Sequence, residues 1–169
     1  MAPILEDLLQ RHLDLVICGA AVGARSAARG LYYAGPGNKF WRTLAAVGLT
    51  DRQLEPTEYR RLLRFGIGLT DLVKEQAGGD RAISFRRADS LRLRLTIMRY
   101  HPRYFCFNGK RAAQEFFATQ HIDVGVQPHR IGGTVLFVAP STSAAANATW
   151  DLSVWQDLAK RVRRRHAAA

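Results

Sequence analysis

The chain has 169 residues, enough for one hydrophobic core, and no linker divides it, so we expect a single domain over residues 1–169. Lys and Arg outnumber Asp and Glu by 25 to 14, and the net charge of +11 favours an acidic polymer as partner, with a merely soluble surface as the alternative. Cys18 and Cys106 lie far apart in apolar runs, which excludes zinc or iron–sulfur spacing. Without a leader pattern or a membrane-length apolar run, we expect a cytoplasmic protein.

Apolar runs and helix-boundary residues predict the elements in chain order. Strands are expected at residues 13–18, 104–107 and 134–138. Helices are expected at residues 38–48, from residue 56 to 65, at 89–100, from 109 to about 120 and at about 150–166. Residues 91–95, "LRLRL", also alternate as a strand would, and residues 75–88 resemble a surface excursion.

The short apolar strands alternate with helices, which predicts an α/β fold. Such strands suit a mostly parallel central sheet covered by helices on both faces. Ligands of these sheets lie beyond the carboxyl ends of the strands. The loops of interest are therefore those after Cys18, around residues 66–71, after Phe107 and after Val138.

The stretch "GAAVGARSAA", residues 19–28, can be compared with a dinucleotide-binding loop. It has two of the three expected glycines, and no acidic residue stands at the end of a following strand. No G-x-x-x-x-G-K-[ST] occurs either, so a nucleotide triphosphatase is not indicated.

Three stretches carry a family resemblance: the run from "VICGAAVGARSAARGLYYAGPGNKFW" through "GIGLTDLV", then "FCFNGKRA", then "FVAPSTSA". Over roughly residues 13–150 the chain resembles the mismatch-specific uracil/thymine DNA glycosylases of the uracil-DNA glycosylase superfamily. The resemblance implies a three-layer α/β/α fold and hydrolysis of the N-glycosidic bond of a flipped base in DNA. It also implies that no metal or cofactor is used.

The resemblance implies that the first motif forms part of the base pocket. The chain departs from the family motif at the position of its asparagine. Where the family reads G-I-N-P-G, this chain has Gly19, Ala20, Ala21, Val22 and Gly23. Ala21 replaces the asparagine that positions the attacking water. The two glycines still allow main-chain N–H groups to approach the base, where negative charge develops as the bond breaks.

The same resemblance assigns pocket roles to residues that follow the first motif. Tyr33 matches an aromatic residue that stacks on the flipped pyrimidine, with packing as the alternative, and Tyr32 is the weaker candidate. Ser26 matches a pocket serine or is a helix cap. Asn38, in "GPGN", is interpreted as a cap more readily than as a substrate contact.

Asp71, in "GIGLTDLV", is the second departure, because family members carry asparagine or lysine there. A carboxylate at this position can accept the N3–H of uracil, or orient a water in the room left by Ala21. We interpret Asp71 as the residue that has taken over the positioning of water. A helix cap or a surface ion pair is the alternative.

The third motif, "PSTSAAANA", matches the loop that contacts phosphates and fills the space left by the flipped base. Pro140, Ser141, Thr142 and Ser143 fit the phosphate contact. Ala144 and Ala145 form a poor wedge, which favours mispaired or single-stranded substrates because their bases are flipped at lower cost.

Asn108 and Lys110, in "FNGK", match a position near the base cleft and a phosphate contact, although this is also ordinary turn chemistry. His101 and His129 are not expected to take part in catalysis. No lysine matches a Schiff-base nucleophile, so strand cleavage is not expected.

These features together predict a monomeric, monofunctional uracil-DNA glycosylase without a cofactor. Three alternatives stay open: a glycosylase for hypoxanthine or mismatched thymine, a catalytically silent module that binds damaged DNA, and a nucleotide-binding regulator.

Overall fold

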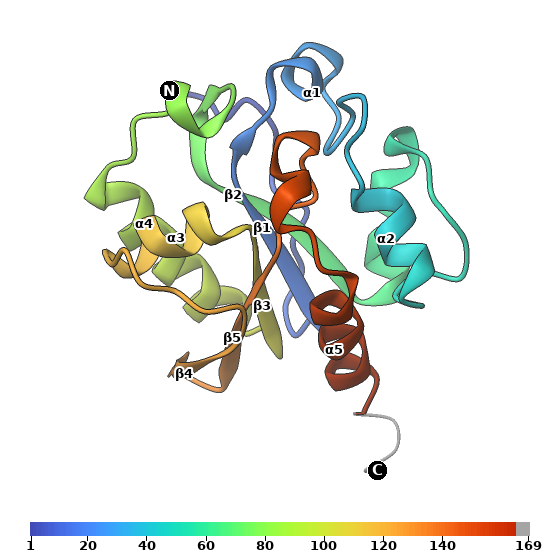
Figure 1. Ribbon diagram of the computed structural model, residues 1–169. Coiled ribbons are helices and arrows are strands. Elements are labelled where there is room, and N and C mark those ends of the chain that lie inside the picture. The colour runs from blue at the N-terminus through green and yellow to red at the C-terminus, as the bar shows by residue number, and fades with distance from the viewer. Residues whose placement is uncertain (165–169) are drawn as a thin grey trace.

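A five-stranded sheet forms the centre of the protein in the computed structural model, which describes residues 1–164 (Figure 1). The strands are β1 (Leu15–Val22), β2 (Ile67–Ala77), β3 (Tyr104–Asn108), β4 (Gly125–Ile131) and β5 (Thr134–Ala139). Their order is β2-β1-β3-β5-β4; all neighbours are parallel except β4, which runs antiparallel to β5 at the edge. The predicted α/β fold with a mostly parallel central sheet is confirmed.

Helices cover both faces of this sheet. The α-helices are α1 (Ala24–Arg29), α2 (Phe40–Ala46), α3 (Arg87–Tyr100), α4 (Lys110–Phe117) and α5 (Leu152–Arg163). The 3₁₀ helices are η1 (Pro56–Phe65), η2 (Asp80–Ala82) and η3 (Ala144–Thr149). Because side chains alternate along a strand, Leu15 and Ile17 of β1 join the core beneath α2 and α5, whereas Val16 and Cys18 join the core beneath α3 and α4 (Figure 1). The sheet and the helices on its two faces therefore form three layers.

Each predicted helix corresponds to a helix in the structure; the 3₁₀ helix η1 has the predicted ends, and the ends of the others are shifted. The stretch "LRLRL" is helical, and Leu93 is fully buried, whereas Leu91 and Leu95 are more than half exposed. The helix predicted at about 150–166 is α5, and the part of that prediction beyond residue 164 lies outside the described residues. No helix within residues 1–164 is both long enough and apolar enough to cross a membrane.

Two strands were not predicted, and the three predicted strands extend past their predicted carboxyl ends, β1 by the most. The prediction of a loop around residues 66–71 is wrong, because β2 begins at Ile67. Its polar residues Thr70 and Asp71 are buried. The edge strand β4 contains Pro128 among the polar Gln127, His129 and Arg130, so it has no apolar run by which to recognise it. β1 continues through Val22, and the predicted excursion at 75–88 begins only after β2 ends.

The carboxyl ends of the four parallel strands meet at one edge of the sheet, and α1 and η3 lie at this end of the molecule (Figure 1). The "GPGN" loop and the third motif approach each other here, since a Cβ atom built on Gly37 would lie 3.1 Å from the Cβ atom of Ala144. β1 pairs with β3 only as far as Cys18 but with β2 as far as Val22. Residues 19–22 therefore have no partner strand on the β3 side of β1 among the described strands.

Candidate active site

Asp71 is buried on β2 and faces the first motif. It is in β2, is 4% exposed, and stands in register with Gly19 of β1. A Cβ atom on Gly19 would lie 2.6 Å from Oδ1 of Asp71 and 3.4 Å from the hydroxyl oxygen of Tyr33. Three residues singled out in the sequence therefore meet at one point, and the missing side chain of Gly19 makes room for the carboxylate.

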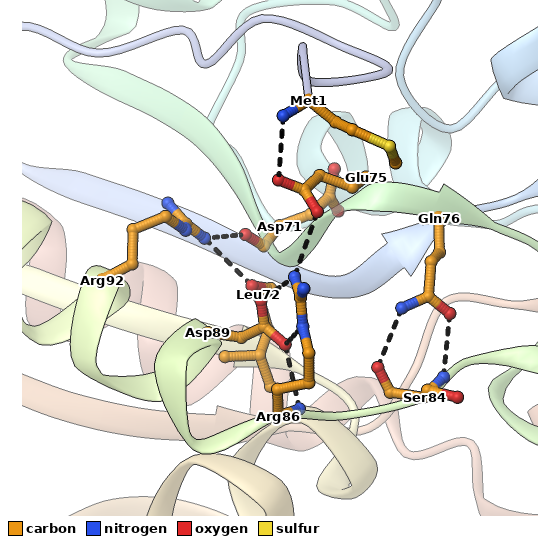
Figure 2. A network of polar contacts seen from close by, with 9 residues as sticks. All are labelled: Met1, Asp71, Leu72, Glu75, Gln76, Ser84, Arg86, Asp89 and Arg92. Carbon is orange, nitrogen blue, oxygen red and sulfur yellow. Dashed lines mark hydrogen bonds and ion pairs between the residues drawn. The ribbon is translucent and has the colours of Figure 1, made fainter.

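The surroundings of Asp71 make its carboxylate unusually basic. Burial raises the pKa of Asp71 from 3.8 to about 6; the cations of Lys74 and Arg92 oppose this shift, and the negative charge of Asp7 adds to it. Lys74 Nζ lies 3.9 Å from Oδ2 of Asp71. Arg92 donates hydrogen bonds to the main-chain oxygens of Asp71 and Leu72, at 2.7 and 3.0 Å (Figure 2). At pH 7 and above the carboxylate is ionised and accepts a proton more readily than an ordinary aspartate.

The raised pKa predicts that Asp71→Asn stabilises the folded protein. Because the pKa of Asp71 is higher in the fold than its ordinary value, its contribution to stability is present below pH 3.8 and is lost as the pH rises to about 6. At pH 8 a neutral asparagine avoids the buried charge, and we expect about 1–3 kcal/mol of added stability. Urea unfolding at pH 8 and pH 4 measures this. A gain of equal size at both pH values contradicts it.

Tyr33 joins the site through both its ring and its hydroxyl. The ring stacks on Phe40 with centroids 3.9 Å apart and is partly exposed. The hydroxyl oxygen is buried and meets no hydrogen-bond partner among the described residues. Burial and the charge of Asp71 raise the pKa of Tyr33, whereas the nearby Asn108 amide lowers it, so the hydroxyl remains protonated and can donate to a ligand. Tyr33 also has a positive φ of 50°.

Tyr32, the weaker candidate for stacking, belongs to the core. It is 2% exposed, and its hydroxyl donates to the main-chain oxygen of Glu6 at 2.9 Å. The weaker prediction that Tyr32 stacks on a base is therefore wrong, and packing is its role.

The remaining residues of the first motif support the site through the backbone. Ala20 and Ala21 are partly buried and pack against the core beneath α3 and α4. Gly23 precedes α1 with an extended backbone. Ser26 is buried within α1, where its hydroxyl accepts the N–H of Ala34 at 2.9 Å. The helix-cap alternative for Ser26 is wrong, and its observed contact holds the chain that leads from Tyr33.

Asn38 lies two residues before α2 and caps its first turn through its side chain, as predicted for a capping residue. Its Oδ1 accepts the Phe40 N–H at 3.0 Å. We expect Asn38→Ala to lower the free energy of unfolding by about 1 kcal/mol, because an N–H of the first turn loses its acceptor. Urea unfolding measures this loss. A variant as stable as the parent chain, but with weaker binding to DNA, would instead favour the substrate contact.

Asn108 and Thr142 tie β3 to the third motif. The Asn108 amide donates to the Thr142 hydroxyl at 3.0 Å, and its Oδ1 accepts the Thr142 N–H at 3.0 Å. Thr142 is 0% exposed. The predicted phosphate contact by the Thr142 side chain is thus wrong, because that side chain is enclosed and serves to hold the loop. The side chains of Ser141 and Ser143 accept main-chain N–H groups within the loop and remain partly exposed.

Lys39 is a further anchor of the third motif that sequence reasoning missed. Its main-chain N–H donates to the Thr142 oxygen at 2.8 Å. Its ammonium donates to Asn147 Oδ1 and, at 3.3 Å, to the Ser143 oxygen. Lys39 is 5% exposed, so the most conspicuous cation of "GPGNKFW" joins two loops and is not a free surface charge.

Lys110 and the two histidines are exposed. Lys110 is the first residue of α4 and follows the carboxyl end of β3. Its phosphate contact stays a prediction. His101 ends α3, and His129 lies on β4. Within residues 1–164, no group of three or more His, Cys, Asp or Glu side chains is placed to hold a metal ion.

A cavity of about 260 Å³ lies against the "GPGN" loop and is lined in part by Tyr33. Its walls include Tyr33, Asn38, Trp41, Arg42 and Gln53. Asp71 and Gly19 do not line it. Tyr33 is therefore near both the cavity and the Asp71 site, but the Asp71 carboxylate does not line the cavity.

Comparison with known proteins agrees with this arrangement. Residues 6–159 match the family model described as the uracil DNA glycosylase superfamily. A solution NMR structure from Methanosarcina acetivorans, named as a candidate uracil DNA glycosylase, is 21% identical and has a TM-score of 0.63. That likeness covers 94% of this chain and 96% of the other, and it establishes the shared fold. Since the family model spans nearly the whole chain, the protein belongs to the uracil DNA glycosylase superfamily.

Proposed function

We propose that the protein is a monofunctional DNA glycosylase that flips uracil out of DNA and hydrolyses its N-glycosidic bond. Membership of the superfamily supports the reaction and DNA as the substrate. The observation that carries the proposal for this chain is the buried Asp71 carboxylate, which faces Gly19 beside the buried Tyr33 hydroxyl, a group without a hydrogen-bond partner within residues 1–164.

Asp71 acts in this proposal on the attacking water. The water oxygen bonds to C1′ of the sugar, the bond from C1′ to N1 of uracil breaks, and the bonding electrons leave with the base. The proton of the water passes to the Asp71 carboxylate, whose raised pKa of about 6 suits a proton acceptor near neutral pH. Asp71 thereby replaces the asparagine that the family motif carries where this chain has Ala21.

The departing base carries negative charge, and the first motif is arranged to receive it. Residues 19–22 have a main-chain edge without a partner strand on the β3 side. N–H groups presented in this way stabilise developing negative charge without reorganising during the reaction. The Tyr33 hydroxyl supplies another donor near Gly19.

Tyr33 also supports the base through stacking. One side of its ring rests on Phe40, which holds the ring in place, while the residue stays partly exposed. Stacking of a base on such a ring contributes about 1–3 kcal/mol.

The third motif supports a preference for bases that are easily flipped. Ala144 and Ala145 are exposed but offer only methyl groups to fill the space left in the duplex. Flipping costs a few kcal/mol and least in mispaired or single-stranded DNA. We therefore propose single-stranded or mismatched uracil-containing DNA as the substrate, in keeping with the mismatch-specific branch of the superfamily.

Oligonucleotides with one lesion each test this function. Uracil is placed in a single strand, opposite guanine and opposite adenine. Hypoxanthine and mismatched thymine are placed in the same flanking sequence. We expect released uracil and strand cleavage only after alkali. Faster release of hypoxanthine or thymine would favour the other glycosylases, and tight binding of abasic DNA without base release would favour the silent module. Strand cleavage without alkali would contradict a monofunctional enzyme.

A further inference from the structure

The Lys74 side chain stands between two carboxylates from distant parts of the chain. Its ammonium lies 2.7 Å from Oδ1 of Asp7 and 3.9 Å from Oδ2 of Asp71. The Lys74 side chain is 10% exposed, so solvent screens these interactions weakly. The cation is therefore closer to the residue of the N-terminal segment than to the site carboxylate.

The N-terminal segment, residues 1–10, is fixed against β2 by main-chain contacts. Leu8 and Leu69 exchange two hydrogen bonds of 2.9 Å, and the N–H of Ile4 donates to the Lys74 oxygen at 2.8 Å. The Thr70 hydroxyl donates to Oδ1 of Asp7 at 2.7 Å. Asp7 is thus held in place from two directions, by its backbone neighbours and by Thr70.

We propose that Lys74 is a positioning residue for Asp71, and that Asp7 of the N-terminal segment holds its ammonium at a distance that leaves the Asp71 carboxylate oriented but free to accept a proton. This inference rests on the proposed function and adds the N-terminal segment to the active site.

The physical reason lies in the two unequal distances. An ammonium in direct hydrogen-bonding contact with Asp71 would stabilise the ionised carboxylate and make it a poor base. Asp7 draws the ammonium toward itself and adds a negative charge close to Asp71. Lys74 therefore orients Asp71 through a weak attraction while the carboxylate keeps much of its basicity.

The other groups that face Asp71 do not replace this pair. Arg92 of α3 donates to the main-chain oxygens of Asp71 and Leu72 (Figure 2), and its cation lowers the pKa of Asp71 less than that of Lys74 does. Cys18 of β1 and the two tyrosines that follow α1 have a pKa raised mainly by burial, so they are neutral near pH 7. Lys74 and Asp7 are accordingly the charged side chains through which the site can be tuned.

Two substitutions should move the titration of Asp71 in opposite directions. In Lys74→Met the carboxylate loses its cation, and the midpoint should rise by about one pH unit. In Asp7→Asn a negative charge disappears and Lys74 is free to approach Asp71, so the midpoint should fall by a similar amount. ¹³C NMR of the Asp71 carboxyl in the DNA-free protein measures the midpoint directly. The acid limb of the single-turnover pH–rate profile should move with it.

Two further variants complete the experiment. Lys74→Arg, which keeps the cation, should restore most of the titration midpoint and rate. Asp157→Asn, which removes an exposed ion pair with Arg161 on α5, should leave both unchanged. Thermal unfolding of each variant confirms that it folds. If Lys74→Met does not fold, Asp7→Asn still tests the proposal.

Shifts in the same direction, or no shift in either variant, would overturn the inference. The NMR titration needs no catalysis, so it separates the two proposals. Opposite midpoint shifts in a protein that releases no base from any lesion would refute the proposed function and leave the control of Asp71 by Lys74 and Asp7 supported.

Discussion

Replacing Asp71 with asparagine is expected to lower the single-turnover rate of uracil release by about 10²–10⁴-fold, the usual contribution of a positioned acid or base. Asparagine keeps the size of the side chain and the contact with Gly19, but it cannot take the proton of the attacking water. Binding of abasic DNA should change little, because the substitution acts on the chemical step. Quenched-flow measurement with uracil-containing single strands gives the rate.

The pH dependence of the parent enzyme provides a second measure of the same role. Because the ionised carboxylate is the active form, the rate should rise with pH through a midpoint near the raised pKa of about 6 and then level off. In Asp71→Asn this limb should disappear. Asp89→Asn is a suitable control, since Asp89 is also buried but lies on α3, paired with Arg86, and its loss should affect stability more than rate (Figure 2). An unaltered rate in Asp71→Asn would remove Asp71 from the mechanism.

Gly19→Ala is expected to reduce the same rate by about 10²-fold through displacement of the Asp71 carboxylate. The new Cβ atom would lie 2.6 Å from Oδ1 of Asp71, closer than Cβ contacts in proteins allow, so the carboxylate must move. Misplacement of a reacting group by about 1 Å can cost this much. The fold should persist, because only a side-chain end has to give way.

The control for this substitution is Gly79→Ala. Gly79 precedes η2, has an ordinary φ, and would place its Cβ in open space. It should leave the rate unchanged. If Gly19→Ala is as active as the parent enzyme, the Asp71 carboxylate does not need its observed position.

Most elements of the fold could be predicted because their sequences carry strong local signals. β3 and β5 are continuous apolar runs, and α2 begins beside Asn38, whose side chain accepts an N–H of its first turn. β2 could not be recognised, because buried Thr70 and Asp71 interrupt its pattern, and the reason they are buried lies in other segments. β4 is an edge strand with little burial, so no alternating pattern marks it.

The candidate site could be predicted in part. The resemblance pointed to Asp71, Gly19 and Tyr33, and the structure brings these three together. It gave no indication of Asp7 or Lys74, because neither belongs to a motif and their contact joins residues far apart in the sequence. Thr142 was assigned to phosphate for its hydroxyl, although burial commits that hydroxyl to Asn108.

The sequence by itself determined the basic charge, the alternation of strands and helices, and the small residues of the first motif. These are properties of composition and of neighbouring residues, which a chain carries before it folds. Only the tertiary structure decided that Asp71 is buried opposite Gly19 and that Asp7 lies within reach of Lys74. The basicity of a carboxylate depends on the solvent excluded around it and on the charges within a few ångströms, and both are set by segments that meet only when the sheet has formed.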